Sequence, residues 1–284
     1  MTAAEQITEP CAHHGEGPVW HADWSGLRWV DMLAGDVLTR DSDSGLVRRR
    51  HVGTAVAALR PRIGGGAVLA LERGFALADD ELTDIRPLGE LWNDPGIRMN
   101  EGGCSPNGSF YCGSMAYDAA PGAGTLYRLD PAGEVHTVRT DVTISNGLAW
   151  SPDGTTAYYV DTPTQRIDAF DHADDEFTGR RTVVHIDPEA GAPDGLAVDS
   201  EGALWVALWG GGALHRYTTR GELLDIVELP VPRVTACTFG GPELDELYIT
   251  TSRVDTDVKA HPEAGAVFRV SRTVPGLPPL PYLG

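Results

Sequence analysis

The sequence predicts an all-β fold, a six-bladed β-propeller, from three observations. A segment made of a polar residue, a glycine, an apolar run and an acidic turn closed by glycine occurs at 145–154 and again at 193–202, with looser copies at 100–108 and 16–26. The glycines that close the turns recur about every 47 residues, a period typical of propellers and solenoids. Short segments rich in aromatic and β-branched residues follow each turn, and no helical periodicity separates them.

Each repeat contributes at least two predicted strands. The first strand after the turn is expected at 27–30, 109–112, 157–160, 204–207 and 247–250, and the next at 37–40, 125–128, 166–170, 213–217 and 266–270. A weaker copy at 63–70, followed by 75–77, supplies the repeat missing from the series and brings the total to six. A β-sandwich or jelly roll is the alternative, but its turns would recur every 8–12 residues or so without the longer period.

The period runs through the chain, so residues 1–284 are expected to form a single propeller domain. The N-terminus has neither a basic apolar leader nor a long apolar run, which predicts a cytoplasmic protein. The four cysteines form no CxxC pair, and free thiols are expected at Cys11, Cys104, Cys112 and Cys237. The proline-rich segment 275–282 cannot form a ladder strand and is expected to pack on the surface as a tail.

The formal charge of −19 argues against nucleic acid and anionic membranes as partners. A small molecule is the expected partner, and the sequence leaves the oligomeric state open. The acidic run at 171–176 is interpreted as a solvated turn and not as a metal site.

Four polar residues occupy one phase of the repeat. Asn100, Asn146 and Asp194 each lie eight residues before the turn glycine, and Glu16 matches them if the first hairpin is two residues longer. Equivalent positions of different blades surround the propeller axis, so these side chains should converge there. The other two blades carry small residues near this phase, around 54–57 and 235–237. A ring that is polar on one side and small or apolar on the other is typical of a ligand pocket.

Each of these residues also has an ordinary structural interpretation. Asn146-Gly147 and Asp194-Gly195 are typical tight-turn dipeptides, and Glu16 alone would be a solvated loop carboxylate. Their shared phase favours a metal site, because two carboxylates and an amide oxygen form a hard oxygen donor set suited to Ca²⁺, Mg²⁺ or Mn²⁺. Without a cation, the two carboxylates would repel each other and resist burial.

Three other patterns favour plain structural roles. His13-His14 is typical of an exposed start of the chain. The glycine runs 64–66 and 210–212 lack the features of a phosphate loop and are interpreted as tight blade turns. No serine lies in a G-x-S-x-G elbow, so the usual serine hydrolase signature is absent.

The chain resembles the regucalcin and gluconolactonase family, also called the senescence marker protein family, of six-bladed propeller lactonases. The matching segments are 15–20, 98–100, 145–150, 193–196, 237–241 and 262–265. The resemblance implies metal ligation by Glu16, Asn146 and Asp194, and substrate contacts from Arg98 and Asn100. Two departures concern the substrate side: Glu101 stands where the family usually has Asp, and Ala120 stands about where some relatives have a substrate-contacting Glu. Glu101 is kept as a candidate substrate contact.

The resemblance implies hydrolysis of a sugar lactone, gluconolactone-like, to its aldonic acid. One divalent cation, with Ca²⁺ expected and Mg²⁺, Mn²⁺ or Zn²⁺ as alternatives, would polarise the lactone carbonyl. Asp194 is the candidate base for the attacking water, and a metal-bound hydroxide is the alternative. Other hypotheses are a non-catalytic calcium-binding regulatory protein and a phosphotriester-type hydrolase on a related propeller. An interaction scaffold is disfavoured, because the Gly-His and Trp-Asp signature of such propellers is absent.

Overall fold

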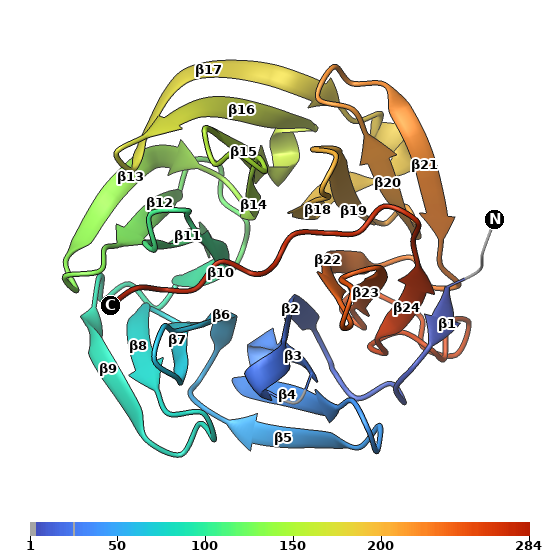
Figure 1. The fold of residues 1–284 in the computed structure, drawn as a ribbon, viewed down its shortest axis with the longest axis horizontal. Coiled ribbons are helices and arrows are strands. Elements are labelled where there is room, and N and C mark those ends of the chain that lie inside the picture. The colour runs from blue at the N-terminus through green and yellow to red at the C-terminus, as the bar shows by residue number, and fades with distance from the viewer. Residues whose placement is uncertain (1–3, 25) are drawn as a thin grey trace.

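The computed structural model describes residues 4–24 and 26–284 and has the six-bladed propeller fold that the sequence predicts (Figure 1). Each blade is a four-stranded antiparallel sheet, and its strands follow one another outwards from the axis. The first three blades are β2 (Gly15–His21), β3 (Gly26–Asp31), β4 (Asp36–Asp41) and β5 (Val47–His51); β6 (Val56–Pro61), β7 (Ala67–Leu71), β8 (Gly74–Ala78) and β9 (Ile85–Glu90); and β10 (Ile97–Cys104), β11 (Phe110–Ala116), β12 (Gly124–Leu129) and β13 (Val135–Val142).

The other three blades complete the circle. They are β14 (Ser145–Trp150), β15 (Thr156–Asp161), β16 (Arg166–Ala173) and β17 (Glu176–His185); β18 (Ala192–Val198), β19 (Leu204–Trp209), β20 (Ala213–Tyr217) and β21 (Leu223–Glu228); and β22 (Val234–Gly240), β23 (Glu246–Thr251), β24 (Phe268–Ser271) and β1 (Glu5–Gln6). Short 3-10 helices η1 (Ala22–Trp24), η2 (Met32–Ala34), η3 (Thr162–Thr164) and η4 (Pro188–Ala190) lie in connections.

The sixth blade contains strands from both ends of the chain. Its outer strand β1 pairs antiparallel with β24, with Glu5 opposite Arg269 and Gln6 opposite Phe268. This pairing closes the ring by joining the first residues to the last blade. The sequence analysis did not anticipate β1, because a two-residue strand has no alternating pattern to reveal it. All the predicted strands overlap observed ones, although 266–267 precede β24.

The turn glycines close the inner hairpins as expected. The N–H groups of Gly108, Gly154 and Gly202 donate to the carbonyls three residues earlier, at 2.8–2.9 Å. Gly154 has φ +74° and the other two have similar values, a left-handed conformation that favours glycine. Apolar side chains fill the space between adjacent sheets, and the largest fully buried ones are Trp29 and Trp205.

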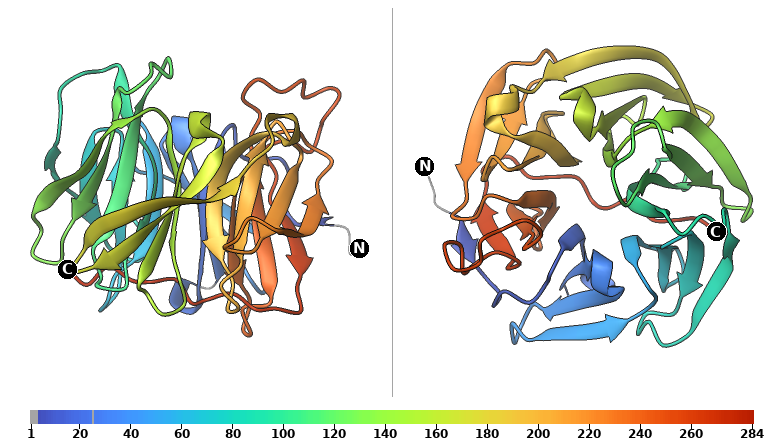
Figure 2. Two further views of the ribbon diagram at one scale, coloured as in Figure 1. Left: turned by 90° about the horizontal axis from the view of Figure 1, so that it is seen from above. Right: turned by 180° about the vertical axis from the view of Figure 1, so that it is seen from behind.

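The C-terminal segment 275–284, called the C-terminal strap below, crosses the middle of one face of the propeller (Figures 1 and 2). At one end the Gly276 N–H donates to the Leu244 carbonyl, and at the other the Tyr282 N–H donates to the Pro61 carbonyl, both at 2.8 Å. Tyr282 is fully buried, and its hydroxyl donates to the Asp130 carbonyl at 2.7 Å. The prediction of a surface-packed tail is confirmed, and the strap links the fifth and sixth blades to the second and third.

The four cysteines are free thiols, as expected. In the described part of the chain, no helix is long and apolar enough to cross a membrane.

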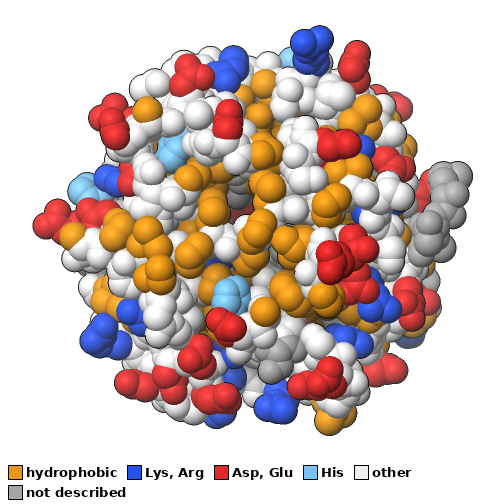
Figure 3. Space-filling model, viewed as in Figure 1, with side chains coloured by type: hydrophobic (Ala, Val, Ile, Leu, Met, Phe, Trp, Pro, Cys, Tyr) orange, Lys and Arg blue, Asp and Glu red, His pale blue; other side chains and the backbone are white. Residues whose placement is uncertain are grey.

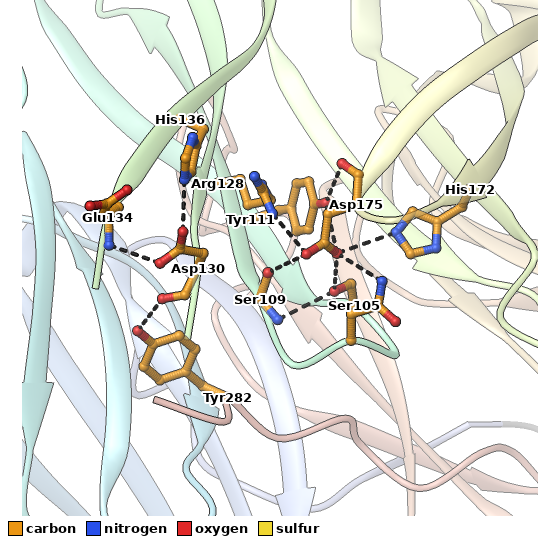
Figure 4. Close-up of polar contacts among 11 residues, drawn as sticks. Ser105, Ser109, Tyr111, Arg128, Asp130, Glu134, His136, His172, Asp175 and Tyr282 are labelled. Atoms are coloured by element: carbon orange, nitrogen blue, oxygen red, sulfur yellow. Dashed lines mark hydrogen bonds and ion pairs between the residues drawn. The ribbon is translucent and has the colours of Figure 1, made fainter. Parts of the chain in front are cut away.

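Asp175 connects the fourth blade to the third (Figure 4). It lies on the tight turn between β16 and β17, and its side chain is only 11% exposed. Ser109 and Ser105 donate to its carboxylate at 2.8 and 3.1 Å, and Arg128 pairs with it at 2.7 Å. The prediction that the acidic run 171–176 is solvated is therefore wrong for Asp175. Burial raises the pKa of this carboxyl, but the two serine hydrogen bonds and the charge of Arg128 outweigh burial and lower the pKa.

Asp175→Asn should lower the free energy of unfolding by about 2 kcal/mol, because it leaves Arg128 partly buried without its counter-charge. Because the folded-state pKa of Asp175 is depressed, this stabilisation is present above the ordinary pKa of 3.8 and is lost as the pH falls below it. Urea unfolding at pH 7 measures the effect, with the exposed neighbour Asp174→Asn as the control. Equal stability of the two variants would show that the contact contributes nothing.

Candidate active site

The innermost strand of every blade has a β-bulge at the same phase. The register shifts lie between Glu16 and Val19, Val56 and Ala58, Met99 and Glu101, Ser145 and Leu148, Pro193 and Leu196, and Val234 and Ala236. A bulge inserts one extra residue into a strand and re-aims its side chains. Asn100, Asn146 and Asp194 lie within these shifts, as do Ala57 and Thr235 in two other blades, whereas Glu16 still pairs with Val30 and immediately precedes its shift.

The structure brings the sequence-predicted residues together around the axis and buries them. Glu16, Asn146 and Asp194 come from β2, β14 and β18 and are 3%, 4% and 5% exposed. Arg98, Asn100 and Glu101 all come from β10 and are 5–7% exposed. These six residues are called the polar ring below.

Gly147 and Gly195 follow the predicted ligands for a steric reason. Asn146-Gly147 and Asp194-Gly195 are not tight turns, because both pairs lie inside inner strands. A Cβ on Gly147 would lie 2.7 Å from the Leu196 nitrogen, and one on Gly195 would lie 2.7 Å from the Ala236 Cα. Each glycine therefore lets its inner strand lie directly against the inner strand of the next blade. This close approach brings the polar side chains of neighbouring blades near one another.

Hydrogen bonds link the polar side chains into a chain across three blades. Arg98 Nη1 donates to Asn100 Oδ1 at 2.6 Å, and Asn100 Nδ2 donates to Asn146 Oδ1 at 3.1 Å. Asn146 Nδ2 donates to the Thr162 hydroxyl at 2.8 Å, and that hydroxyl donates to the carbonyl of Pro193, the residue before Asp194. These contacts fix the amide of Asn146 so that its oxygen lies on the side of Asn100.

The surroundings of the Glu16 and Asp194 carboxyl groups disfavour their charged forms. Burial raises the pKa of Glu16 well above its ordinary value of 4.5, and the nearby charge of Glu101 raises it further. Burial also raises the pKa of Asp194, with added repulsion from Glu16 and Glu101. The one hydrogen bond to the Glu16 carboxylate from the described residues comes from the Gly17 N–H, at 3.0 Å. Two buried carboxylates and an amide oxygen therefore form a donor set that a divalent cation fits, since its charge would relieve the repulsion.

Glu101 lies in the same buried centre. Burial raises its pKa to about 7, although the charge of Arg60 acts in the opposite direction. Its Oε2 atom is buried and has no hydrogen-bond partner among the described residues. An unpartnered carboxylate oxygen is costly to bury, so the site is incomplete without a further group.

Arg98 is positioned by residues that the sequence analysis did not identify. Its Nη1 atom lies 3.0 Å from the Met32 Sδ atom, and its guanidinium lies 5.6 Å from the centre of the Tyr117 ring. The Tyr117 hydroxyl donates to Glu72 Oε1 at 2.7 Å, and burial with this contact raises the pKa of Tyr117 to about 12. Tyr117 is 46% exposed, so it forms part of the rim of the site.

His14 is buried, which corrects the expectation of an exposed start of the chain at this residue. Its Nδ1 atom lies 2.8 Å from the Ser252 hydroxyl, and its ring packs edge-on against Trp209. Burial and the charge of Arg98 lower its pKa to about 3, so it is neutral at pH 7. A neutral imidazole beside Arg98 adds no positive charge to the site.

A second group of metal-ligating residue types lies on the hairpin between β12 and β13. Asp130, Glu134 and His136 bring their ligand atoms within 4.8 Å of one another. Asp130 already accepts hydrogen bonds from the Glu134 N–H and from His136, at 2.9 and 2.8 Å (Figure 4). This cluster is partly to fully exposed, and its Asp130 carboxylate is already hydrogen-bonded, unlike the buried Oε2 atom of Glu101 at the axis.

Comparison with known proteins assigns the family. The model of the SMP-30/gluconolactonase/LRE-like region matches residues 14–253. The chain belongs to this family. It is 37% identical to regucalcin of Danio rerio over 281 residues, which cover 95% of each chain. Family membership agrees with the resemblance seen in the sequence segments around Glu16, Asn146 and Asp194.

Two solved structures share the fold over almost the whole chain. One is a calcium-binding protein, regucalcin, from Agrobacterium tumefaciens, with TM-score 0.93, 29% identity and coverage of 99% of this chain and 97% of that one. The other is luciferin-regenerating enzyme, with TM-score 0.91, 30% identity and coverage of 99% of both chains.

The buried carboxylates predict the behaviour of the metal-free protein. Because the folded-state pKa values of Glu16 and Asp194 are raised, the free energy of unfolding in EDTA should fall as the pH rises past about 4.5. Glu16→Gln removes one of the repelling charges and should stabilise the metal-free protein by about 1 kcal/mol or more at pH 7. Urea unfolding from pH 5 to 8 measures both effects, with the exposed Glu9→Gln as control. A destabilised Glu16→Gln variant in EDTA would contradict this account.

Proposed function

We propose that the protein is a metal-dependent lactonase that hydrolyses a sugar lactone of the gluconolactone type to its aldonic acid. The observation that carries the proposal is the burial of Glu16, Asn146 and Asp194, which come from three blades, together with their links to Arg98 and Asn100 through hydrogen bonds and charge. Metal binding alone requires only the first three residues. The adjacent buried arginine and asparagine are suited to hold a polar substrate next to the cation, which favours an enzyme.

Glu16, Asn146 and Asp194 would hold the divalent cation, with Ca²⁺ expected because its oxygen-rich coordination suits two carboxylates and an amide. This choice is supported by the calcium-binding description of the Agrobacterium relative. When bound, the cation supplies positive charge that stabilises the negative charge developing on the lactone carbonyl oxygen.

The side chains of β10 would orient the substrate. Arg98 presents a guanidinium held by Asn100 and Met32, so it loses little freedom when it donates to a lactone oxygen. Glu101 has a free buried oxygen that can accept a hydrogen bond from a sugar hydroxyl. Tyr117 at the rim offers an aromatic edge to the sugar ring. In this arrangement, β10 and Tyr117 recognise the substrate.

Asp194 would accept the proton of the attacking water. Burial together with the charges of Glu16 and Glu101 raises its pKa in the metal-free protein, whereas a bound cation would lower it. The charge of Arg98 also lowers this pKa. A metal-bound hydroxide, with Asp194 relaying the proton, is therefore the alternative. Addition of the water oxygen to the lactone carbonyl carbon would be followed by breakage of the ring C–O bond, and the proton held by Asp194 would pass to the released ring oxygen, which becomes a hydroxyl of the aldonic acid.

A lactone panel tests the proposal. Metal-stripped protein is mixed with gluconolactone, xylonolactone, arabinolactone or galactonolactone, with Ca²⁺, Mg²⁺, Mn²⁺ or Zn²⁺ added back, and acid release is followed. We expect hydrolysis of at least one lactone that requires added metal. Asp194→Asn should lower turnover by two or more orders of magnitude, roughly the contribution of a general base, while the exposed Asp84→Asn keeps wild-type activity.

Three outcomes would contradict parts of the proposal. Hydrolysis at the wild-type rate by folded Asp194→Asn protein would remove Asp194 from the mechanism. Calcium binding with no hydrolysis of any lactone would favour the non-catalytic calcium-binding hypothesis, and hydrolysis of phosphotriesters alone would favour the phosphotriesterase hypothesis.

A further inference from the structure

A cavity of about 500 Å³ lies beneath the C-terminal strap, at the end of the axis opposite the polar ring. The inner strands begin at the polar ring, and their later residues form the cavity wall. The wall is mostly apolar and includes Val19, Leu148, Ala149, Leu196 and Phe239. Leu277 and Leu280 of the strap also line it. A cavity of this size and lining is typical of small-molecule sites.

The strap face is hollowed beside a belt of hydrophobic side chains that crosses its middle (Figure 3). This belt follows the course of the strap in Figure 1. The cavity is therefore reached from the surface on this face.

Arg60 is the one cationic side chain among the described residues that line this cavity. Its Nη1 atom donates to the Leu59 carbonyl at 2.6 Å and its Nη2 atom to the Gly102 carbonyl at 2.5 Å. These contacts use two of the five N–H groups of a guanidinium and leave three free. The side chain remains partly exposed, so it can meet a ligand in the cavity.

No carboxylate of the described residues lies within 4.0 Å of the Arg60 guanidinium nitrogens. Glu101 influences Arg60 through its charge but forms no ion pair with it. Asp153 also lines the cavity, but its Oδ1 atom already accepts hydrogen bonds from Ser151 and Thr155. A partly buried cation without a paired anion carries a desolvation cost, which an anion in the cavity would offset.

We propose that the strap cavity is a second binding site, distinct from the polar ring, for a small organic anion with an aliphatic body. The carboxylate of such a ligand would pair with Arg60, whose planar fork can donate two parallel hydrogen bonds. The aliphatic body would lie against the apolar wall formed by residues such as Leu148 and Leu196. The site is separate from the proposed catalytic residues, so it does not depend on the lactonase proposal.

Isothermal titration calorimetry with octanoate, 1-octanol and octylammonium tests the site. The three probes share one aliphatic chain and differ in charge, so they separate apolar burial from recognition by Arg60. Octanoate should bind at one site per chain, about tenfold or more tighter than 1-octanol, with octylammonium weakest.

Two variants locate the binding. Ala149→Phe fills the cavity from a partly exposed wall position and keeps Arg60, so it should weaken octanoate and 1-octanol alike by about tenfold or more. Arg60→Met keeps the apolar volume and should abolish the preference for octanoate. Neither variant removes a residue of the polar ring.

Equal binding of octanoate and 1-octanol by the wild-type protein would overturn the proposal, as would the absence of any octanoate binding. Unchanged octanoate binding by Ala149→Phe would overturn it too. These tests hold even if Arg60→Met fails to fold, since Arg60 also joins the second and third blades through its two backbone contacts.

Discussion

The burial of Glu16 and Asp194 at the propeller axis is the constraint on which the rest of the structure depends. Isolated carboxylates are expensive to remove from water, and two of them near each other are more so. Apolar packing elsewhere between the sheets offsets this cost. The nearest positive charge, that of Arg98, lowers the pKa of both carboxyls without restoring ordinary values. A site under such strain is a usual mark of function and not of stability.

The repeated bulge explains how a regular scaffold presents an irregular site. Every inner strand has a register shift at or directly after the aligned position, and a shift of this kind re-aims the side chains beside it. Four blades carry Glu16, Asn100, Asn146 and Asp194 at this position, and the other two carry the smaller residues Ala57 and Thr235. Substitution at these six positions can therefore change the chemistry without changing the sheets. The opposite end of the same strands is apolar and is covered by the strap, which gives the axis two chemically different ends.

Much of the fold could be read from the sequence because it repeats. The turn glycines and the strands after them recur locally, and the shared phase of Asn100, Asn146 and Asp194 predicts that they surround the axis. Contacts between distant segments could not be predicted from the repeat. The pairing of β1 with β24 and the Met32 contact to Arg98 have no local pattern, and the burial of Asp175 depends on a neighbouring blade. The glycines after Asn146 and Asp194 had the composition of turns, and only the packing of adjacent bulges explains them.

The position of a bound divalent cation tests the proposed site most directly. A crystal grown from metal-stripped protein and soaked in Mn²⁺ would show the ion directly by its anomalous scattering. We expect one strong peak at the axis, bound by the carboxylates of Glu16 and Asp194 and by the amide oxygen of Asn146. A peak at the surface cluster of Asp130, Glu134 and His136 with none at the axis would contradict the central claim.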